Sequence, residues 1–130
     1  MTIRSTLRIL LAAAYFIAGV LHLIRPGGFL AITPGWVLWP EAVVAFTGIA
    51  EILGAIGLMI PRFRAAAGIG LALYAVCVFP ANINHALYAI PLGGQTLGWS
   101  YHGPRLALQP VFVWLALWVG HVIDWPFRRR

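Results

Sequence analysis

Four long apolar segments constrain the fold of this chain more than any other feature of its sequence. A helix needs about 20 mostly apolar residues to cross the roughly 30 Å hydrocarbon core of a bilayer. Charged residues make up only 9% of the chain, whereas a soluble domain has about 25%. The sequence therefore predicts an all-α integral membrane protein, a single four-helix bundle with spans at residues 9–24, 42–60, 65–88 and 105–123.

The first apolar segment follows a short basic lead, which is also how a secretory signal peptide begins. The apolar run continues past Ala12, Ala13 and Ala14, the small residues that a cleavage site would use. Removing this segment would leave three spans and an incomplete bundle. We therefore expect it to stay in the protein as the first span.

The uneven placement of arginine predicts the orientation in the membrane. Of the 9 basic residues, only Arg25 and Arg105 adjoin the two long connections, 25–41 and 90–104. The others flank the termini and the tight 61–64 connection: Arg4, Arg8, Arg62, Arg64, Arg128, Arg129 and Arg130. Because cytoplasmic segments carry the excess of Lys and Arg, we expect both termini in the cytoplasm and both long connections outside.

Charge and cysteine content exclude two classes of function. The formal charge of +6 could suggest nucleic acid, but the arginines lie beside apolar segments, where they act as orientation signals. We therefore expect the lipid bilayer as a partner, and no nucleic acid. Cys77 is the one cysteine, so the chain cannot form an internal disulfide or a CxxC pair and is not a self-contained thiol oxidoreductase.

Glu51 is the most informative single residue, because it lies inside the apolar stretch 46–59. A carboxylate at the bilayer centre costs about 2.5–3.5 kcal/mol on insertion scales. It should therefore face protein or trapped water and have a polar partner. The other predicted spans supply candidates in the same outer half of the bundle: His22, Asn82, His85, Arg105 and Gln109. We infer a polar pocket at this level.

Each of these candidates also has a purely structural interpretation. His22 could cap the end of its helix, and His85 and Arg105 could lie in the membrane interface. Asn82 and Gln109 could form hydrogen bonds between helices. These alternatives stay open at the level of the sequence.

We favour a functional pocket, because four predicted helices place polar groups at similar depths. Glu51 and His22 form a candidate catalytic pair for proton transfer, since burial shifts the pKa of a carboxyl and an imidazole in opposite directions. The predicted ligand-binding residues are Asn82, His85, Arg105 and Gln109. His102 and His121 are interpreted as loop and helix-end residues without a role.

Four stretches of the chain resemble the DoxX family of small four-span bacterial membrane proteins. They are AGVLHLIRPGGF (18–29), FTGIAEILGAIGLMIPRFR (46–64), VFPANINHAL (78–87) and RLALQPVFVW (105–114). The resemblance covers most of the chain and implies a multi-pass protein of the bacterial inner membrane. The polar residues of the family fall on His22, Glu51, Asn82, Arg105 and Gln109.

The resemblance also implies a redox association, since the family takes its name from a subunit of a quinone-linked sulfur oxidoreductase. The first functional hypothesis is an accessory subunit or binding module of a membrane redox system. Its pocket would hold a quinone head group or similar lipid, and its partner would be a membrane or soluble oxidoreductase subunit. The second hypothesis is an acid–base enzyme acting on a lipid or isoprenoid. A homo-oligomer is compatible with either.

Haem or metal binding is the third hypothesis and the least favoured. Only His22 and His85 offer an axial pair for haem. Their depths along the predicted helices differ by roughly 9 Å, so we expect no b-type haem. His22, Glu51 and His85 would be three ligands on three helices, which is a weak basis for a metal site.

Overall fold

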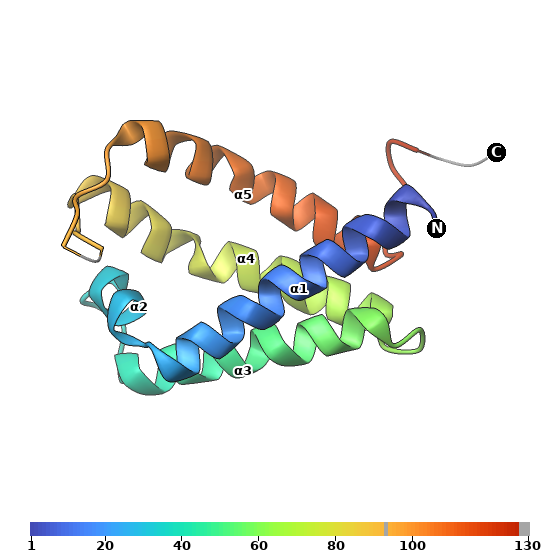
Figure 1. Cartoon of the computed structure of the whole chain (residues 1–130), viewed down its shortest axis with the longest axis horizontal. Helices are drawn as coiled ribbons and strands as arrows, with labels where there is room; N and C mark the ends of the chain where they lie inside the picture. The colour runs from blue at the N-terminus through green and yellow to red at the C-terminus, as the bar shows by residue number, and fades with distance from the viewer. Residues whose placement is uncertain (93, 128–130) are drawn as a thin grey trace.

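The computed structural model describes residues 1–92 and 94–127, and this part of the chain is helical without strands (Figure 1). The helices are α1 (Ile3–Ile24), α2 (Gly27–Ile32), α3 (Pro40–Met59), α4 (Arg64–Leu87) and α5 (Trp99–Val119). Three of them, α1, α3 and α4, are long and apolar enough to cross a membrane. The prediction of an all-α protein is confirmed for the described residues, and three of the four predicted spans correspond to helices that could cross a membrane; α5 is not among them.

The α5 helix differs from its prediction at both ends. We expected a connection over 90–104 and a helix over 105–123, whereas the helix begins at Trp99 and ends at Val119. Pro104 lies five residues after Trp99, where it removes the backbone hydrogen bond to the Ser100 carbonyl, yet the helix continues through it. The amino-terminal half of α5 holds Arg105, Gln109 and two prolines, so α5 is less apolar than the other long helices.

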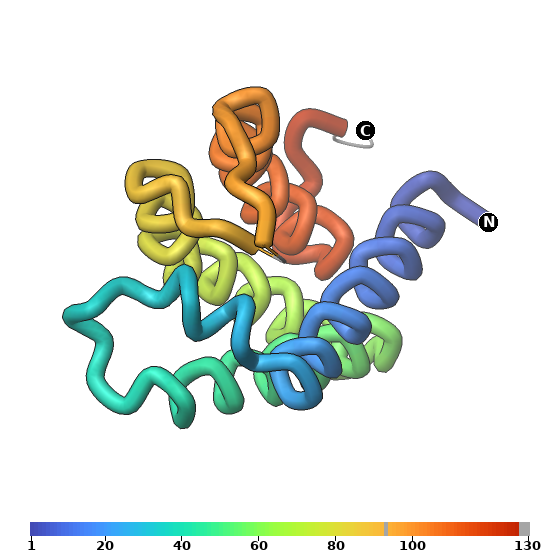
Figure 2. Tube along the Cα trace, turned by 60° about the vertical axis from the view of Figure 1, so that its left-hand side comes forward, coloured from blue at the N-terminus to red at the C-terminus, as the bar shows by residue number. Residues whose placement is uncertain are grey.

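The four long helices pack in two pairs, α1 with α3 and α4 with α5, and the pairs meet where α3 lies along α4 (Figures 1 and 2). The termini lie at one end, which we call the terminal end. The connections that contain α2 and residues 88–92 and 94–98 lie at the opposite, loop end. There the Asn84 side-chain amide donates a hydrogen bond of 3.0 Å to the Ile32 carbonyl.

Glycine brings α1 and α3 into close contact. A Cβ atom placed on Gly19 would lie 2.6 Å from the Gly48 carbonyl oxygen, and one on Gly48 would lie 2.7 Å from the Cβ of His22. No side chain larger than hydrogen fits such a distance without moving the backbone. This crossing of small residues fixes the position of His22 relative to α3.

At the terminal end, two arginines of α1 hold the last turn of α5. Arg4 donates to the carbonyl oxygens of Trp118 and Ile123 at 2.7 and 2.8 Å, and it forms a 2.8 Å ion pair with Asp124. Arg8 donates to the Val119 carbonyl at 2.9 Å. Arg8 therefore satisfies the Val119 carbonyl at the end of α5, a group that a helix end leaves without an intrahelical partner, and Arg4 ties the following residues to α1. The tail arginines of the predicted topology, 128–130, lie outside the described residues.

His121 accepts a hydrogen bond of 2.7 Å from Arg8 and follows α5 with a positive φ of 62°. Desolvation, together with the positive charges of Arg4, Arg8 and Arg64, lowers the pKa of His121 below 6.5, although Asp124 opposes the shift. A lowered folded-state pKa means that the unfolded chain binds this proton first as the pH falls. The stability contributed by neutral His121 is present above pH 6.5. It is lost as the pH falls through the lowered folded-state pKa of His121.

We therefore predict that the melting temperature of the detergent-solubilised protein decreases between pH 7.5 and 5.5, and that His121→Asn makes this decrease smaller. Asparagine does not titrate and tolerates a positive φ. Differential scanning fluorimetry of both proteins across this pH range measures the difference in slope. Equal slopes would contradict the assignment of the effect to His121.

Candidate functional site

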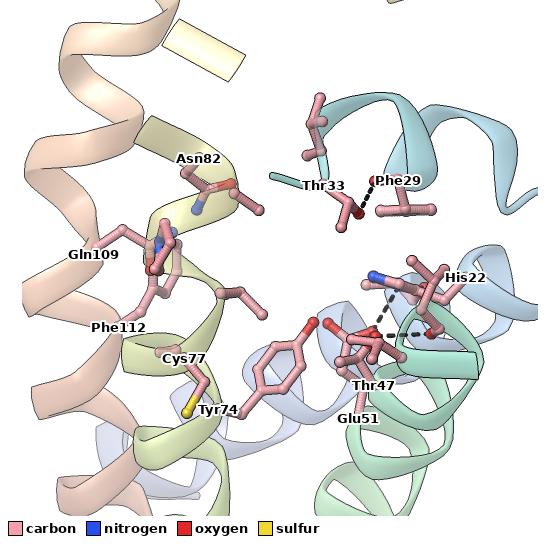
Figure 3. A pocket seen from close by; sticks show the side chains of 18 of the residues that line it. His22, Phe29, Thr33, Thr47, Glu51, Tyr74, Cys77, Asn82, Gln109 and Phe112 are labelled. Carbon is pink, nitrogen blue, oxygen red and sulfur yellow. Dashed lines mark hydrogen bonds and ion pairs between the residues drawn. The ribbon is translucent and has the colours of Figure 1, made fainter. Parts of the chain in front are cut away.

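A cavity of about 460 Å³ lies between the two helix pairs, toward the loop end (Figure 3). Residues of all five helices line it, and five of the six predicted site residues are among them: His22, Glu51, Asn82, Arg105 and Gln109. Figure 3 shows two unlike sides, with His22 and Glu51 on one side and Asn82 and Gln109 on the other. The structure thus brings together polar groups that are separated by up to 87 positions in the sequence, from His22 to Gln109.

Glu51 is buried, with 3% of its surface exposed, and contacts His22. The Nδ1 of His22 lies 2.8 Å from the Ala18 carbonyl oxygen and 2.9 Å from Glu51 Oε2. Both oxygens can only accept, so the Nδ1 proton lies between two competing acceptors. Among the described residues Oε2 has no other hydrogen-bond donor, and it retains its capacity to accept a hydrogen bond or a proton.

Two tyrosines, which the sequence analysis did not select, complete this side of the site. Figure 3 shows the Tyr74 side chain extending from α4 toward Glu51. Tyr15 of α1 packs edge-on against Tyr74, with ring centroids 5.9 Å apart. The helical spacing of Tyr15 and His22 on one stripe of α1 was the available signal for Tyr15. Tyr74 carried no such signal, because its neighbours in α4 are apolar.

Arg105 connects the cavity to a buried histidine pair. Its Nη1 donates to His85 Nδ1 at 3.0 Å, and the His85 and His102 rings meet edge-on with centroids 4.6 Å apart. His85 and His102 are 0% and 2% exposed. His85 does not line the cavity, so the predicted direct contact with a ligand is not seen; it instead holds the guanidinium group. The interpretation of His102 as a loop residue is wrong, since it packs inside α5 against His85.

The α2 segment covers the loop end of the cavity. Phe29 stacks on the His22 ring, with centroids 3.6 Å apart and planes 19° from parallel. Ile32 is buried, and Thr33 bonds back to the Phe29 carbonyl at 2.8 Å. The sequence predicted only a long connection over 25–41, so the stacking of an aromatic ring on His22 is a further feature of the site.

The chemistry of the cavity follows from these contacts. One side offers a carboxylate, an imidazole and a phenol, which accept and donate protons, and the other offers a guanidinium and two amides, which donate hydrogen bonds to oxygen. The remaining lining is mostly apolar, as in most small-molecule sites.

In residues 1–92 and 94–127, no three His, Cys, Asp or Glu side chains form a metal-binding group. The expectation of no b-type haem stays a prediction.

Comparison with known proteins places the chain in a family without assigning it an activity. No curated protein matches the sequence, and no solved structure matches it. One family model matches residues 11–120, which contain all six predicted site residues and α2 to α5 in full. The chain therefore belongs to the family described as "Domain of unknown function (DUF8561)".

Proposed function

We propose that this protein is a small-molecule binding module of the bacterial inner membrane, in which α1, α3, α4 and α5 form a four-helix bundle. Its cavity holds the polar head of a lipid-soluble amphiphile, of which a quinone is the best-fitting class. A quinone head has carbonyl oxygens on opposite sides of a flat ring. One oxygen would accept hydrogen bonds from Arg105, Gln109 and Asn82, and the other would accept one from His22 Nε2, with Glu51 balancing the charge of the imidazolium.

The observation that carries this proposal is the opposition of two polar sides across a mostly apolar cavity. A structural network would pair the groups of the two sides with each other, whereas Glu51 Oε2 lies against His22 Nδ1 on its own side, at 2.9 Å, and that nitrogen is shared with the Ala18 carbonyl. The cavity volume of about 460 Å³ lies within the usual range for small-molecule sites, about 300–1,000 Å³. The resemblance to the DoxX family supports a role beside an oxidoreductase subunit in a membrane redox system.

Native mass spectrometry of gently extracted protein tests the proposal first, because it reports any retained quinone or lipid. A thermal shift titration then uses dimethoxymethylbenzoquinone with a decyl tail, since a ligand that binds only the folded state raises its melting temperature. We expect a saturable rise that Gln109→Leu reduces and that Phe46→Leu, a change on the exposed face of α3, leaves unaltered. No retained amphiphile and no thermal shift would refute the proposal.

An acid–base enzyme acting on a lipid or isoprenoid is the second candidate function, and the contact of Glu51 with His22 at 2.9 Å favours it. A buried carboxylate beside an imidazole can take a proton from one atom of a substrate while the neighbouring groups return one elsewhere. Turnover of a lipid by the purified protein alone, abolished in Glu51→Gln, would distinguish an enzyme from a binding module.

The proposed orientation places the terminal end in the cytoplasm and the loop end outside. The structure has both termini at one end (Figure 1), and the arginine distribution motivates the choice of side. We predict that Gly35→Cys, but not Thr2→Cys, reacts with a membrane-impermeant maleimide in sealed cells, each in a Cys77→Ala background. Labelling of Thr2→Cys from outside would overturn the orientation.

A further inference from the structure

The cavity reaches the side of the helix array, at a level well inside the helices. Six residues that line it are also exposed: Ala14, Trp36, Val43, Cys77, Pro80 and Phe112. Trp36 and Val43 lie near the loop end, whereas Ala14 of α1, Cys77 of α4 and Phe112 of α5 lie further along the helices. Ala14 and Cys77 each lie ten residues before the loop end of their helix, as counted to Ile24 and Leu87. At a rise of 1.5 Å per residue this is roughly 15 Å, which is half the thickness of the hydrocarbon core, about 30 Å.

The arrangement of α1 and α5 explains why the cavity is exposed at this level. The hydrogen bonds between them, from Arg4 and Arg8 to the last turn of α5, lie at the terminal end. From there the two helices diverge toward the loop end, and α4 lies behind the space between them (Figure 1). The loop end itself is covered by α2, with Phe29 on His22 and Ile32 bonded to Asn84.

We propose that the cavity opens sideways into the hydrocarbon layer between α1 and α5, and that its ligand is a neutral amphiphile whose tail stays in the bilayer. This inference rests on the proposed function, because it assumes that the head group occupies the cavity. The polar groups would bind the head, while the apolar lining around Ala14 and Phe112 continues into lipid. Molecules that are dissolved only in water would not reach the site by this opening.

The experiment compares two probes in phosphatidylcholine nanodiscs: dimethoxymethylbenzoquinone with a decyl tail, and the same ring with a methyl group in place of the tail. Both rings are fully substituted, so neither offers an unsubstituted ring carbon to which the Cys77 thiol could add. The test variant is Ala14→Trp, which fills the opening. Its control is Ala13→Trp, which adds the same side chain at an exposed neighbour that does not line the cavity.

We expect Ala14→Trp to weaken binding of the decyl probe at least ten-fold and binding of the methyl probe much less, with melting temperatures close to that of Ala13→Trp. The decyl probe should also slow the reaction of Cys77 with N-ethylmaleimide, measured by mass. Unchanged decyl binding in Ala14→Trp, with binding still sensitive to Glu51→Gln, would overturn the side opening alone. A wild-type protein that binds neither probe would overturn the proposed function together with this inference.

Discussion

Glu51→Gln is expected to leave the protein folded and to weaken binding of the decyl quinone roughly ten- to hundred-fold. The amide keeps the size and shape of the carboxylate but removes its charge. A quinone has only acceptor oxygens, so Glu51 acts on it through His22: the carboxylate balances the charge of an imidazolium that donates to the quinone. A hydrogen bond from a charged donor contributes about 1.5–3 kcal/mol, and each 1.4 kcal/mol is about ten-fold in affinity. Binding isotherms and melting curves of the same preparations separate the loss of affinity from a loss of stability.

Glu51→Leu provides the second arm of this test, because it removes hydrogen bonding as well as charge. We expect it to lower the melting temperature as well as affinity, since it leaves the polar groups that face Glu51 inside the protein without an acceptor. If Glu51 were only an anchor between helices, Gln would lower stability and leave ligand binding intact. A Glu51→Leu protein equal to wild type in expression, melting temperature and bound small molecules would refute the pocket.

Gly19→Ala is expected to have the largest effect on the fold. The added Cβ would lie 2.6 Å from the backbone oxygen of Gly48, so α1 and α3 have to separate. Overpacking of this kind costs about 1–3 kcal/mol. His22 lies one turn further along α1, so the separation also moves its ring away from Glu51 and lowers ligand affinity. Thermal unfolding and quinone binding measure the two consequences.

Gly70→Ala is the matched control for this change. Gly70 also lies inside a long helix, but a Cβ atom there meets nothing within 4 Å. Both variants share the gain in helix propensity of alanine over glycine, so their difference isolates the helix crossing. Equal melting temperatures in Gly19→Ala and Gly70→Ala would show that the close approach of α1 and α3 does not stabilise the protein.

Hydropathy predicted the elements well where a segment is apolar throughout. The ends of α3 and α4 fall within two residues of the expected spans. Hydropathy placed the ends of α5 wrongly, because polar residues and prolines lower the hydropathy of a segment without preventing a helix. The same limit applies to α2, which is too short to produce an apolar segment of its own and is stabilised by burial of Ile32 and the stacking of Phe29 on His22.

The site could be predicted as a set of unusual residues but not as a geometry. A polar side chain in an apolar span is conspicuous, so Glu51, His22 and Asn82 were found. Which groups face the cavity depends on how each helix is rotated about its axis and on which helix it packs against. The periodicity of apolar residues does not determine either in helices that are apolar on every side. This is why the sequence placed His85 beside the ligand, whereas it lies behind Arg105 and bonds to it.

The bonds from Arg4 to the end of α5 impose an order on the synthesis of the protein. They join residues 114 and 119 positions apart, so they form only after α5 has left the ribosome. In contrast, α1 and α3 are complete by Met59 and can already place His22 against Glu51 through their glycine contact. His22 and Glu51 can therefore meet before the chain that carries Asn82, Arg105 and Gln109 has been made.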